Sequence, residues 1–207
     1  MKDPGFAKFV LLVNGAVPLA MLGWDAYWKE LGANPVNSSL HVTGTTALVF
    51  IVLTLMVTPA RKLTGWNWLS HFRRMLGLYA FFYGVAHLSI YFAFDQSFSL
   101  PAVVRDTLEH RYIFFGMAAL LLMAPLAATS TNGMIKRLGA AKWKRLHRLV
   151  YLSAVAAVVH YLLIGKLVGP KPKAFAAAVA ILLAYRVAAG RFAGIRKARL
   201  PTGSSAA

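Results

Sequence analysis

Three histidines lie inside or at the edge of strongly apolar segments, and their type and placement suit them to chemistry. His87 lies in GLYAFFYGVAHLSIYFAF, whereas His147 and His160 lie in LHRLVYLSAVAAVVHYLLIG. An ionisable side chain inside a membrane is costly and usually faces a partner or a cofactor. Neutral imidazole is also the commonest side-chain ligand for metals such as iron, copper and zinc. The three histidines are therefore candidate metal or cofactor ligands.

The positions of His87 and His160 along their segments predict that their rings lie at similar depth. If these helices begin near Met75 and Leu146, a rise of about 1.5 Å per residue places His87 about 18 Å and His160 about 21 Å along them. Two imidazoles at one depth on neighbouring helices can bind a planar macrocycle from both sides, as b-type haem is commonly held in helix bundles. We therefore expect His87 and His160 to ligate a haem in the outer half of the membrane.

His147 is expected to ligate or support a separate site nearer the cytoplasm. On one continuous helix it would lie about 20 Å along the axis and about 140° of rotation from His160, so the two cannot bind the same ion. The sequence suggests no obvious partner for His147. The alternative for each histidine is an ordinary packing or hydrogen-bonding role within a membrane bundle. His41 and His110 are predicted to be interface or surface residues.

The elements that must position these side chains are membrane helices. The 207 residues are 58% hydrophobic and 14% charged, whereas soluble domains are about half apolar and about a quarter charged. We predict an all-α, polytopic bundle of six transmembrane helices in a single domain, 1–199, with a disordered tail at 200–207. Six apolar runs approach the roughly 20 residues that a membrane-spanning helix needs: 6–24, 40–59, 75–94, 112–128, 147–168 and 174–190.

Local signals refine these helices. Pro59 is expected to end the second helix, because proline disrupts a helix interior. The segment PAVVRDTLEH is expected to form a short surface helix after Pro101. The sixth run gives the weakest signal, because it is rich in alanine and carries Arg186 near its end.

Basic residues are divided unequally between the two sides of the predicted bundle, 17 against 6. The positive-inside rule places the richer side, and with it both termini, in the cytoplasm. The net charge of +17 is therefore a topology signal with contacts to membrane lipid, and not a nucleic-acid-binding surface. The richer side holds Lys2, Lys8, Arg61, Lys62, Arg73, Arg74, Lys136, Arg137, Lys142, Lys144, Arg145, Arg148, Arg186, Arg191, Arg196, Lys197 and Arg199, and the other holds Lys29, Arg105, Arg111, Lys166, Lys171 and Lys173.

Several other functions find little support in the sequence. The chain has no cysteine, which excludes disulfides, thiolate metal sites and iron–sulfur clusters. It has no HExxH, no glycine-rich phosphate loop, no GxSxG elbow and no internal repeat that stands out. The spans lack carboxylates, which argues against a proton-coupled transporter. Two alternatives remain open: a small transporter or channel with a histidine-lined path, and a ferric or cupric reductase acting at the outer face.

A series of motifs resembles one known family over nearly the whole chain. These motifs are GANPV (32–36), HVTG (41–44), VTPARK (57–62), RRMLGLYAF (73–81) followed by His87–Leu88, LGAAKWKRLHRLVYL (138–152) and HY (160–161). They resemble, in the same order, the haem-binding membrane subunits of bacterial periplasmic methionine sulfoxide reductase systems. These subunits, of the YedZ/MsrQ type, belong to the ferric-reductase-like transmembrane group.

The resemblance implies a six-helix, b-haem protein of the bacterial inner membrane. Such a protein would pass electrons from the quinone pool, or from a cytoplasmic flavin reductase, to a periplasmic molybdopterin subunit. That partner, and not this chain, would reduce methionine sulfoxide in oxidised proteins. In the family, the haem histidines match His87, His147 and His160 of this sequence.

The resemblance leaves the number of haems, one or two, open. Larger ferric reductases carry two histidine pairs and a soluble flavin and nicotinamide domain, whereas this chain has three intramembrane histidines and requires a separate electron donor. FMN is described as a further cofactor of the family, although the sequence shows no flavin motif. Arg73, Arg74 and Arg148, at predicted helix ends, are candidates to pair with haem propionates or a flavin phosphate; the alternative is that they only set topology.

Overall fold

The computed structural model of the chain describes residues 4–164 and 169–199, and every regular element in this part is a helix. Six helical segments are long and apolar enough to cross a membrane, which confirms the predicted fold class. The predicted tail at 200–207 lies outside the described residues. The elements are α1 (Pro4–Tyr27), α2 (Pro35–Thr64), η1 (Asn67–Phe72), α3 (Arg73–Ile90), η2 (Tyr91–Asp95), α4 (Leu100–Glu109), α5 (Arg111–Ala128), α6 (Asn132–Leu138), α7 (Ala140–Leu146), α8 (Leu149–Ile164) and α9 (Lys171–Arg199).

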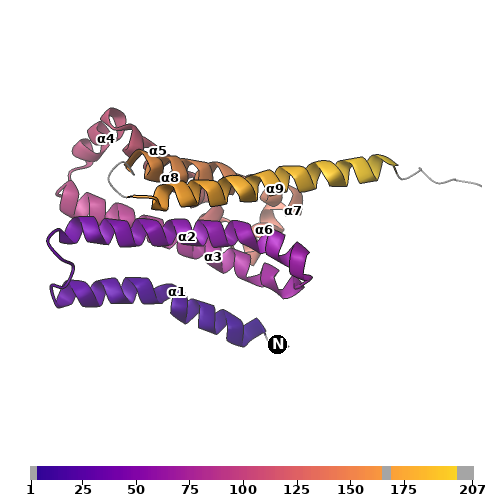
Figure 1. Cartoon of the computed structure of the whole chain (residues 1–207), viewed down its shortest axis with the longest axis horizontal. Coiled ribbons are helices and arrows are strands. Elements are labelled where there is room, and N and C mark those ends of the chain that lie inside the picture. The colour runs from indigo at the N-terminus through magenta and orange to yellow at the C-terminus, as the bar shows by residue number, and fades with distance from the viewer. Residues whose placement is uncertain (1–3, 165–168, 200–207) are drawn as a thin grey trace, which may run out of the picture.

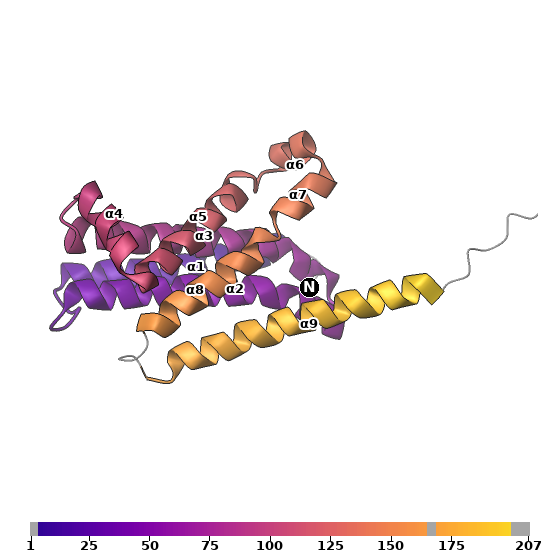
Figure 2. The same ribbon diagram turned by 90° about the horizontal axis from the view of Figure 1, so that it is seen from above.

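The bundle is organised around two helix pairs. The most extensive contacts join α2 to α3 and α5 to α8, and α9 packs against both α8 and α2 (Figures 1 and 2). Small residues allow close approach, as membrane helices commonly require. Ala80 and Ala154 are almost completely buried, and the Ser153 hydroxyl donates to the carbonyl of Ala119 at 2.9 Å, which ties α8 to α5.

Helix α2 continues through Pro59 to Thr64, so the prediction that Pro59 ends it was wrong. Proline has no N–H to give to the carbonyl four residues earlier, which here belongs to Leu55. The guanidinium of Arg186 on α9 donates to this carbonyl at 2.8 Å and to the Tyr151 hydroxyl at 2.9 Å. A freed backbone group is thus satisfied by a neighbouring helix, as membrane bundles allow. The same contacts explain how an arginine is accommodated within the last span.

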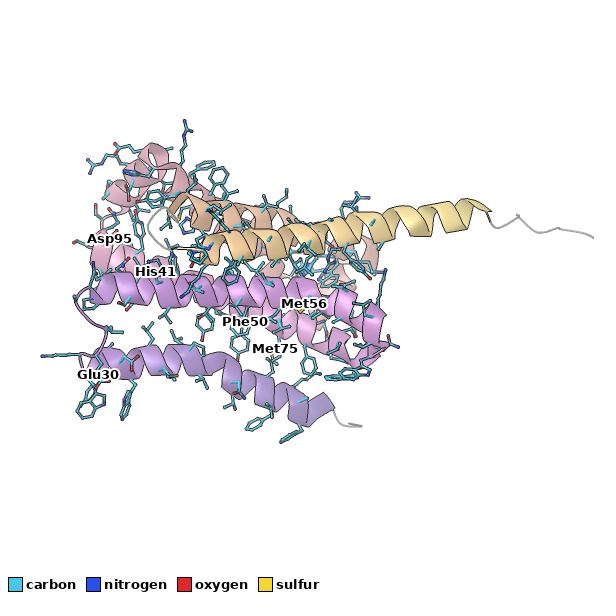
Figure 3. All side chains as sticks on the ribbon, viewed as in Figure 1. Glu30, His41, Phe50, Met56, Met75 and Asp95 are labelled. Carbon is cyan, nitrogen blue, oxygen red and sulfur yellow. The ribbon has the colours of Figure 1, made fainter. Side chains whose placement is uncertain are left out.

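Helix α1 is held to the bundle by a tyrosine of α3. The Tyr83 hydroxyl donates to the Gly15 carbonyl at 2.8 Å and accepts from the Leu19 N–H at 3.1 Å. It therefore inserts into the hydrogen-bond ladder of α1 beside Pro18, which is a recognised cause of helix kinks. The Tyr83 ring also stacks on Phe50 of α2, with centroids 5.6 Å apart. Figure 3 shows Phe50 on the α1 side of α2.

The two ends of the bundle differ in their elements. The short helix α4 lies at one end, here the α4 end, where Glu30 and Asp95 also lie (Figures 1 and 3). The predicted surface helix after Pro101 is confirmed by α4, which begins one residue earlier, at Leu100. The basic helices α6 and α7 lie at the opposite end, here the α6 end. The start of α1 and the end of α9 both point toward the α6 end, as an even number of spans requires (Figure 1).

Candidate functional site

A cavity of about 840 Å³ opens between the two helix pairs, in the half of the bundle nearer the α4 end. Its volume lies within the range of roughly 300–1,000 Å³ that is typical of cofactor and small-molecule sites. Four helices, α2, α3, α5 and α8, contribute its walls. The lining is mostly apolar and includes Leu48, Ile51, Leu88, Ile113, Met117 and Leu120.

His87 and His160 both line this cavity, one from each helix pair. His87 lies on α3 and His160 on α8. Their ring centroids are 6.1 Å apart, and the ring planes are nearly perpendicular at 87°. The two rings therefore lie close together, as the prediction that both ligate one haem requires.

Both imidazoles are oriented by backbone carbonyls through the same ring nitrogen. Nδ1 of His87 lies 3.0 Å from the Leu40 carbonyl, and Nδ1 of His160 lies 2.6 Å from the Tyr112 carbonyl. A carbonyl only accepts hydrogen bonds, so each Nδ1 carries the proton as the donor. The neutral rings then present an unprotonated Nε2, which is the form that binds metals. Ligand histidines are commonly oriented by such a bond from the other ring nitrogen.

The spacing of the two rings fits one metal ion between them. An ion bonded to a nitrogen of each imidazole at about 2 Å would hold the ring centres about 6 Å apart. Among the described residues, no group of three or more histidine, aspartate or glutamate side chains could hold a metal ion. The site therefore suits an ion that brings its other ligands with it, as the iron of a haem does. The large apolar cavity between the two helix pairs supplies space for such a macrocycle.

The cavity becomes polar toward the α4 end. The polar residues there are Asn34, Asn37, His41, Tyr91, Asp95 and Tyr112. Figure 3 shows His41 and Asp95 near this end. His41 was predicted to be an interface residue, and the sequence did not indicate that it would line the same cavity as His87. Its place one turn from Gly44 on α2 brings it there.

A hydrogen-bonded cluster fixes α4 beside this polar mouth. The carboxylate of Asp106 accepts from the Tyr91 hydroxyl and from the Gln96 amide, the latter at 3.1 Å. Its other oxygen lies 2.5 Å from Nδ1 of His110, whose side chain is 48% exposed. The prediction of His110 as a surface residue is thus confirmed. Tyr112 connects this cluster to the site, because its ring lies 5.6 Å from that of His110 and 6.3 Å from that of His160.

His147 lies apart from this cavity, in the short break between α7 and α8. The predicted rotation of about 140° relative to His160 assumed one continuous helix, and that assumption was wrong. Here the Arg148 and Val150 N–H groups bond to carbonyls only three residues earlier, which tightens the turn. The His147 ring lies on Trp143, with centroids 3.8 Å apart. Its buried Nδ1 has no hydrogen-bond partner among the described residues.

The three candidate arginines lie at the α6 end and do not line the cavity that holds His87 and His160. Arg73 donates to the Thr58 hydroxyl at 2.7 Å, and Arg74 donates to the side-chain carbonyl of Asn132 at 2.8 Å. Arg148 is exposed. Any pairing of these arginines with a cofactor therefore concerns a site at the α6 end.

Comparison with known proteins gives a family match over most of the bundle. Residues 42–158 match the family described as "Ferric reductase like transmembrane component". The matched segment extends from α2 into α8. It includes His87 and His147, and it ends two residues before His160.

Relatives that are similar over nearly the full chain carry the name "Protein-methionine-sulfoxide reductase heme-binding subunit MsrQ". The relative from Herminiimonas arsenicoxydans is 41% identical over 182 residues, which cover 87% of this chain and 84% of the relative. The relative from Rhodospirillum rubrum is 43% identical over 180 residues, covering 87% and 86%. The relative from Ralstonia nicotianae is 47% identical over 184 residues, covering 87% and 83%.

Proposed function

Because the chain belongs to the ferric-reductase-like transmembrane family, and within it to the MsrQ heme-binding subunits, we propose that it conducts electrons across the bacterial inner membrane by means of b-type haem. The observation that carries this proposal is the pair formed by His87 and His160. Both rings line one cavity, and their centroids are 6.1 Å apart. Each ring donates its Nδ1–H to a backbone carbonyl. Two oriented imidazoles, with no third protein ligand among the described residues, would hold the iron of a haem, which brings its other ligands with it.

Within this site, His87 and His160 would hold the iron, and the bound haem would supply a one-electron carrier. The carbonyls of Leu40 and Tyr112 keep each ring in the tautomer that leaves Nε2 unprotonated. The mostly apolar lining would influence the redox potential, which depends on burial and polarity. The protein thus supplies binding, orientation and a mostly apolar environment.

The unequal distribution of basic residues supports an orientation of the bundle in the membrane, and from this orientation we infer the direction of electron flow. By the positive-inside rule, the basic helices α6 and α7 support an orientation in which the α6 end faces the cytoplasm. The pair of His87 and His160 then lies in the periplasmic half of the membrane. Electrons would leave at the α4 end for a periplasmic partner, the molybdopterin-dependent methionine sulfoxide reductase that repairs oxidised proteins. The sulfoxide chemistry belongs to that catalytic subunit.

Electrons would enter at the α6 end, from the quinone pool or from a cytoplasmic flavin reductase. His147 supports a second site there, because its buried Nδ1 has no partner in the described part of the chain. The occupant of that site would be a second haem or FMN. Arg73, Arg74 and Arg148 would pair with its propionates or phosphate, since guanidinium groups bind such anions well.

The decisive experiment is to purify the chain in detergent and to quantify haem per polypeptide by its Soret absorbance. We expect the wild-type protein to contain b-type haem. His87→Ala and His160→Ala should each abolish ligation by two histidines at the α4-half site, which is the pair of His87 and His160 in the half of the bundle nearer the α4 end. His71→Ala, which removes an exposed imidazole of η1 outside the cavity lining, should leave it intact. A colourless wild-type protein, or a haem content per polypeptide and a spectrum that alanine at both His87 and His160 leaves unchanged, would overturn the proposal.

A second experiment identifies the electron acceptor by following the reoxidation of the reduced protein. Reoxidation by the periplasmic catalytic subunit, and not by chelated iron, is expected for an electron-transfer subunit. Rapid reoxidation by chelated iron or copper alone would instead favour a ferric or cupric reductase acting at the outer face. Solute transport into liposomes by a colourless protein would favour a small transporter.

A further inference from the structure

We infer that Gly44 and Gly116 are positioning residues for the two ligand histidines, each acting together with the backbone carbonyl four residues before it. The inference rests on the proposed function, because it assigns these two glycines a role in orienting the axial ligands of a haem. Each half of the site then consists of the same three parts: a backbone carbonyl, a glycine four residues later, and the histidine that contacts both.

Each imidazole lies directly against a glycine of the facing helix. A Cβ atom at Gly44 would lie 3.0 Å from both Cε1 and Nδ1 of His87. A Cβ atom at Gly116 would lie only 2.8 Å from Nδ1 and 3.0 Å from Cε1 of His160. Packed atoms have their best contact at about 3.5–4.0 Å. Any residue other than glycine would therefore move the ring or the helix.

The position of each glycine follows from the geometry of the helix. In an α-helix, the carbonyl of residue i points toward the N–H of residue i+4. The acceptors are Leu40 and Tyr112, and the glycines stand four residues later, at Gly44 and Gly116. The missing side chain at i+4 opens a path along which the imidazole can reach the carbonyl of residue i. The carbonyl has two lone pairs, so it can accept from both the helix N–H and the ring.

The arrangement occurs twice with nearly the same spacing. His87 follows its acceptor by 47 residues, and His160 follows its acceptor by 48 residues. In each unit, a helix that provides the carbonyl and the glycine pairs with the helix that carries the histidine: α2 with α3, and α5 with α8. The two units face each other across the cavity. The glycine is the one residue that the segments LHVTG (40–44) and YIFFG (112–116) share.

The two units are not equally tight. Nδ1 of His87 has a second neighbour, the Thr43 hydroxyl at 3.3 Å, and its carbonyl contact is 3.0 Å. Nδ1 of His160 has the single, shorter contact of 2.6 Å. Because a methyl group at Gly116 would also come closer to the ring that it faces, we expect substitution at Gly116 to have the larger effect.

The test compares Gly44→Ala and Gly116→Ala with the matched control Gly77→Ala. Gly77 lies within α3, outside the cavity lining, and a Cβ there would meet only Thr54 Cγ2 at 4.0 Å. Haem per polypeptide, the midpoint potential and the electron paramagnetic resonance spectrum of the oxidised protein are measured. That spectrum depends on the relative orientation of axial imidazole planes, so a merely structural role would not change it.

We expect Gly116→Ala to weaken haem binding by about 10–100-fold, the range seen when groups that orient a metal ligand are lost. The haem retained by either alanine variant should show a shifted spectrum and potential, and Gly77→Ala should match the wild type. Wild-type values for both Gly44→Ala and Gly116→Ala would overturn the inference while leaving the proposed function intact. A haem-free wild-type protein would instead contradict the proposed function.

A second measurement covers a loss of folding in Gly116→Ala. The methyl group is expected to clash with the His160 ring, so removing that ring should relieve the strain. We therefore compare thermal unfolding of the haem-free Gly116→Ala, His160→Ala and doubly substituted proteins. A smaller effect of the glycine substitution in the His160→Ala background supports the inference, whereas strictly additive effects overturn it.

Discussion

The two histidine sites of the bundle differ in how completely the protein itself organises them. In the half nearer the α4 end, His87 and His160 face each other, and each is oriented by a carbonyl. At the α6 end, His147 lies on Trp143 with a buried Nδ1 that has no partner among the described residues. A buried group without a hydrogen bond costs about 1–3 kcal/mol. The first site holds two oriented imidazoles, which are the proposed haem ligands, whereas the second holds a buried ring nitrogen without a partner among the described residues.

The two sites also differ in the polarity and charge of their surroundings. The cavity beside His87 and His160 is mostly apolar, and none of the three candidate arginines lines it. Arg73, Arg74 and Arg148 lie at the α6 end, as His147 does. The α4-half site would therefore hold its ligand through its shape and through the two imidazoles. The α6 end favours an anionic group, such as a propionate or a phosphate.

The largest contrast between these sites is expected when His160 and His147 are each replaced by alanine in separate variants. We expect His160→Ala to lower haem affinity at the α4-half site by more than about 100-fold, because it removes a ligand and not only an orienting partner. His147→Ala should leave the spectrum and potential of that site unchanged. The measurement is a redox titration of each purified variant, with haem quantified per polypeptide.

The control for this comparison is His71→Ala, which removes an exposed imidazole of η1 outside the cavity lining. If His147→Ala abolished all bound haem while the variant remained folded, the two sites would not be independent. The division into a complete site and an incomplete site would then be wrong.

The sequence predicted the six spans because their length and hydropathy are local properties, but it could not predict how α2 passes Pro59. The helix continues because Arg186 satisfies the carbonyl of Leu55, 131 residues away in the sequence. A local rule for proline contains no information about such a partner. The same contact explains why a basic residue occurs in the last span.

The sequence was sufficient to predict which histidine side chains form the site, but not which backbone carbonyls orient them. Equal depth along two helices was enough to bring His87 and His160 together. Their acceptors are the backbone carbonyls of Leu40 and Tyr112. Every residue has such a carbonyl, so residue type does not indicate which one accepts. The break at His147 was also missed, because the run from Leu146 to Ile164 is apolar enough to suggest one uninterrupted helix. The glycines at 44 and 116 were the one available signal for the repeated units.

Arg186 offers a way to disturb the α6 half of the bundle alone. Arg186→Leu removes the hydrogen bonds to Leu55 and Tyr151. Bonds from charged donors contribute about 1.5–3 kcal/mol each, but removal also eliminates the cost of burying the charge. We expect a net loss of about 1–2 kcal/mol in the free energy of unfolding, which corresponds to a fall in Tm of several degrees. Thermal unfolding in detergent measures it.

Arg137→Leu is the matched control, because Arg137 is an exposed arginine in α6 at the same end. It should change Tm little, since exposed charges contribute little to stability. The haem spectrum of the α4-half site should be unchanged in both variants. A change in that spectrum in Arg186→Leu would show that packing at one end is transmitted to the other site.

Thr43→Val makes the smallest and most local change, within the α4-half site itself. The buried Thr43 hydroxyl donates to the Ser39 carbonyl at 2.7 Å and accepts from Nδ1 of His87 at 3.3 Å. Valine keeps the shape but removes this second acceptor, while the Leu40 carbonyl at 3.0 Å still orients the ring. Because a neutral hydrogen bond contributes about 0.5–1.5 kcal/mol, and this one is long, we expect a loss near the lower limit, or about twofold in haem affinity. Haem titration of the two purified proteins, with the midpoint potential as a second readout, measures the effect. A loss as large as that of His160→Ala would mean that the carbonyl does not suffice to orient His87, and that the two units depend on different acceptors.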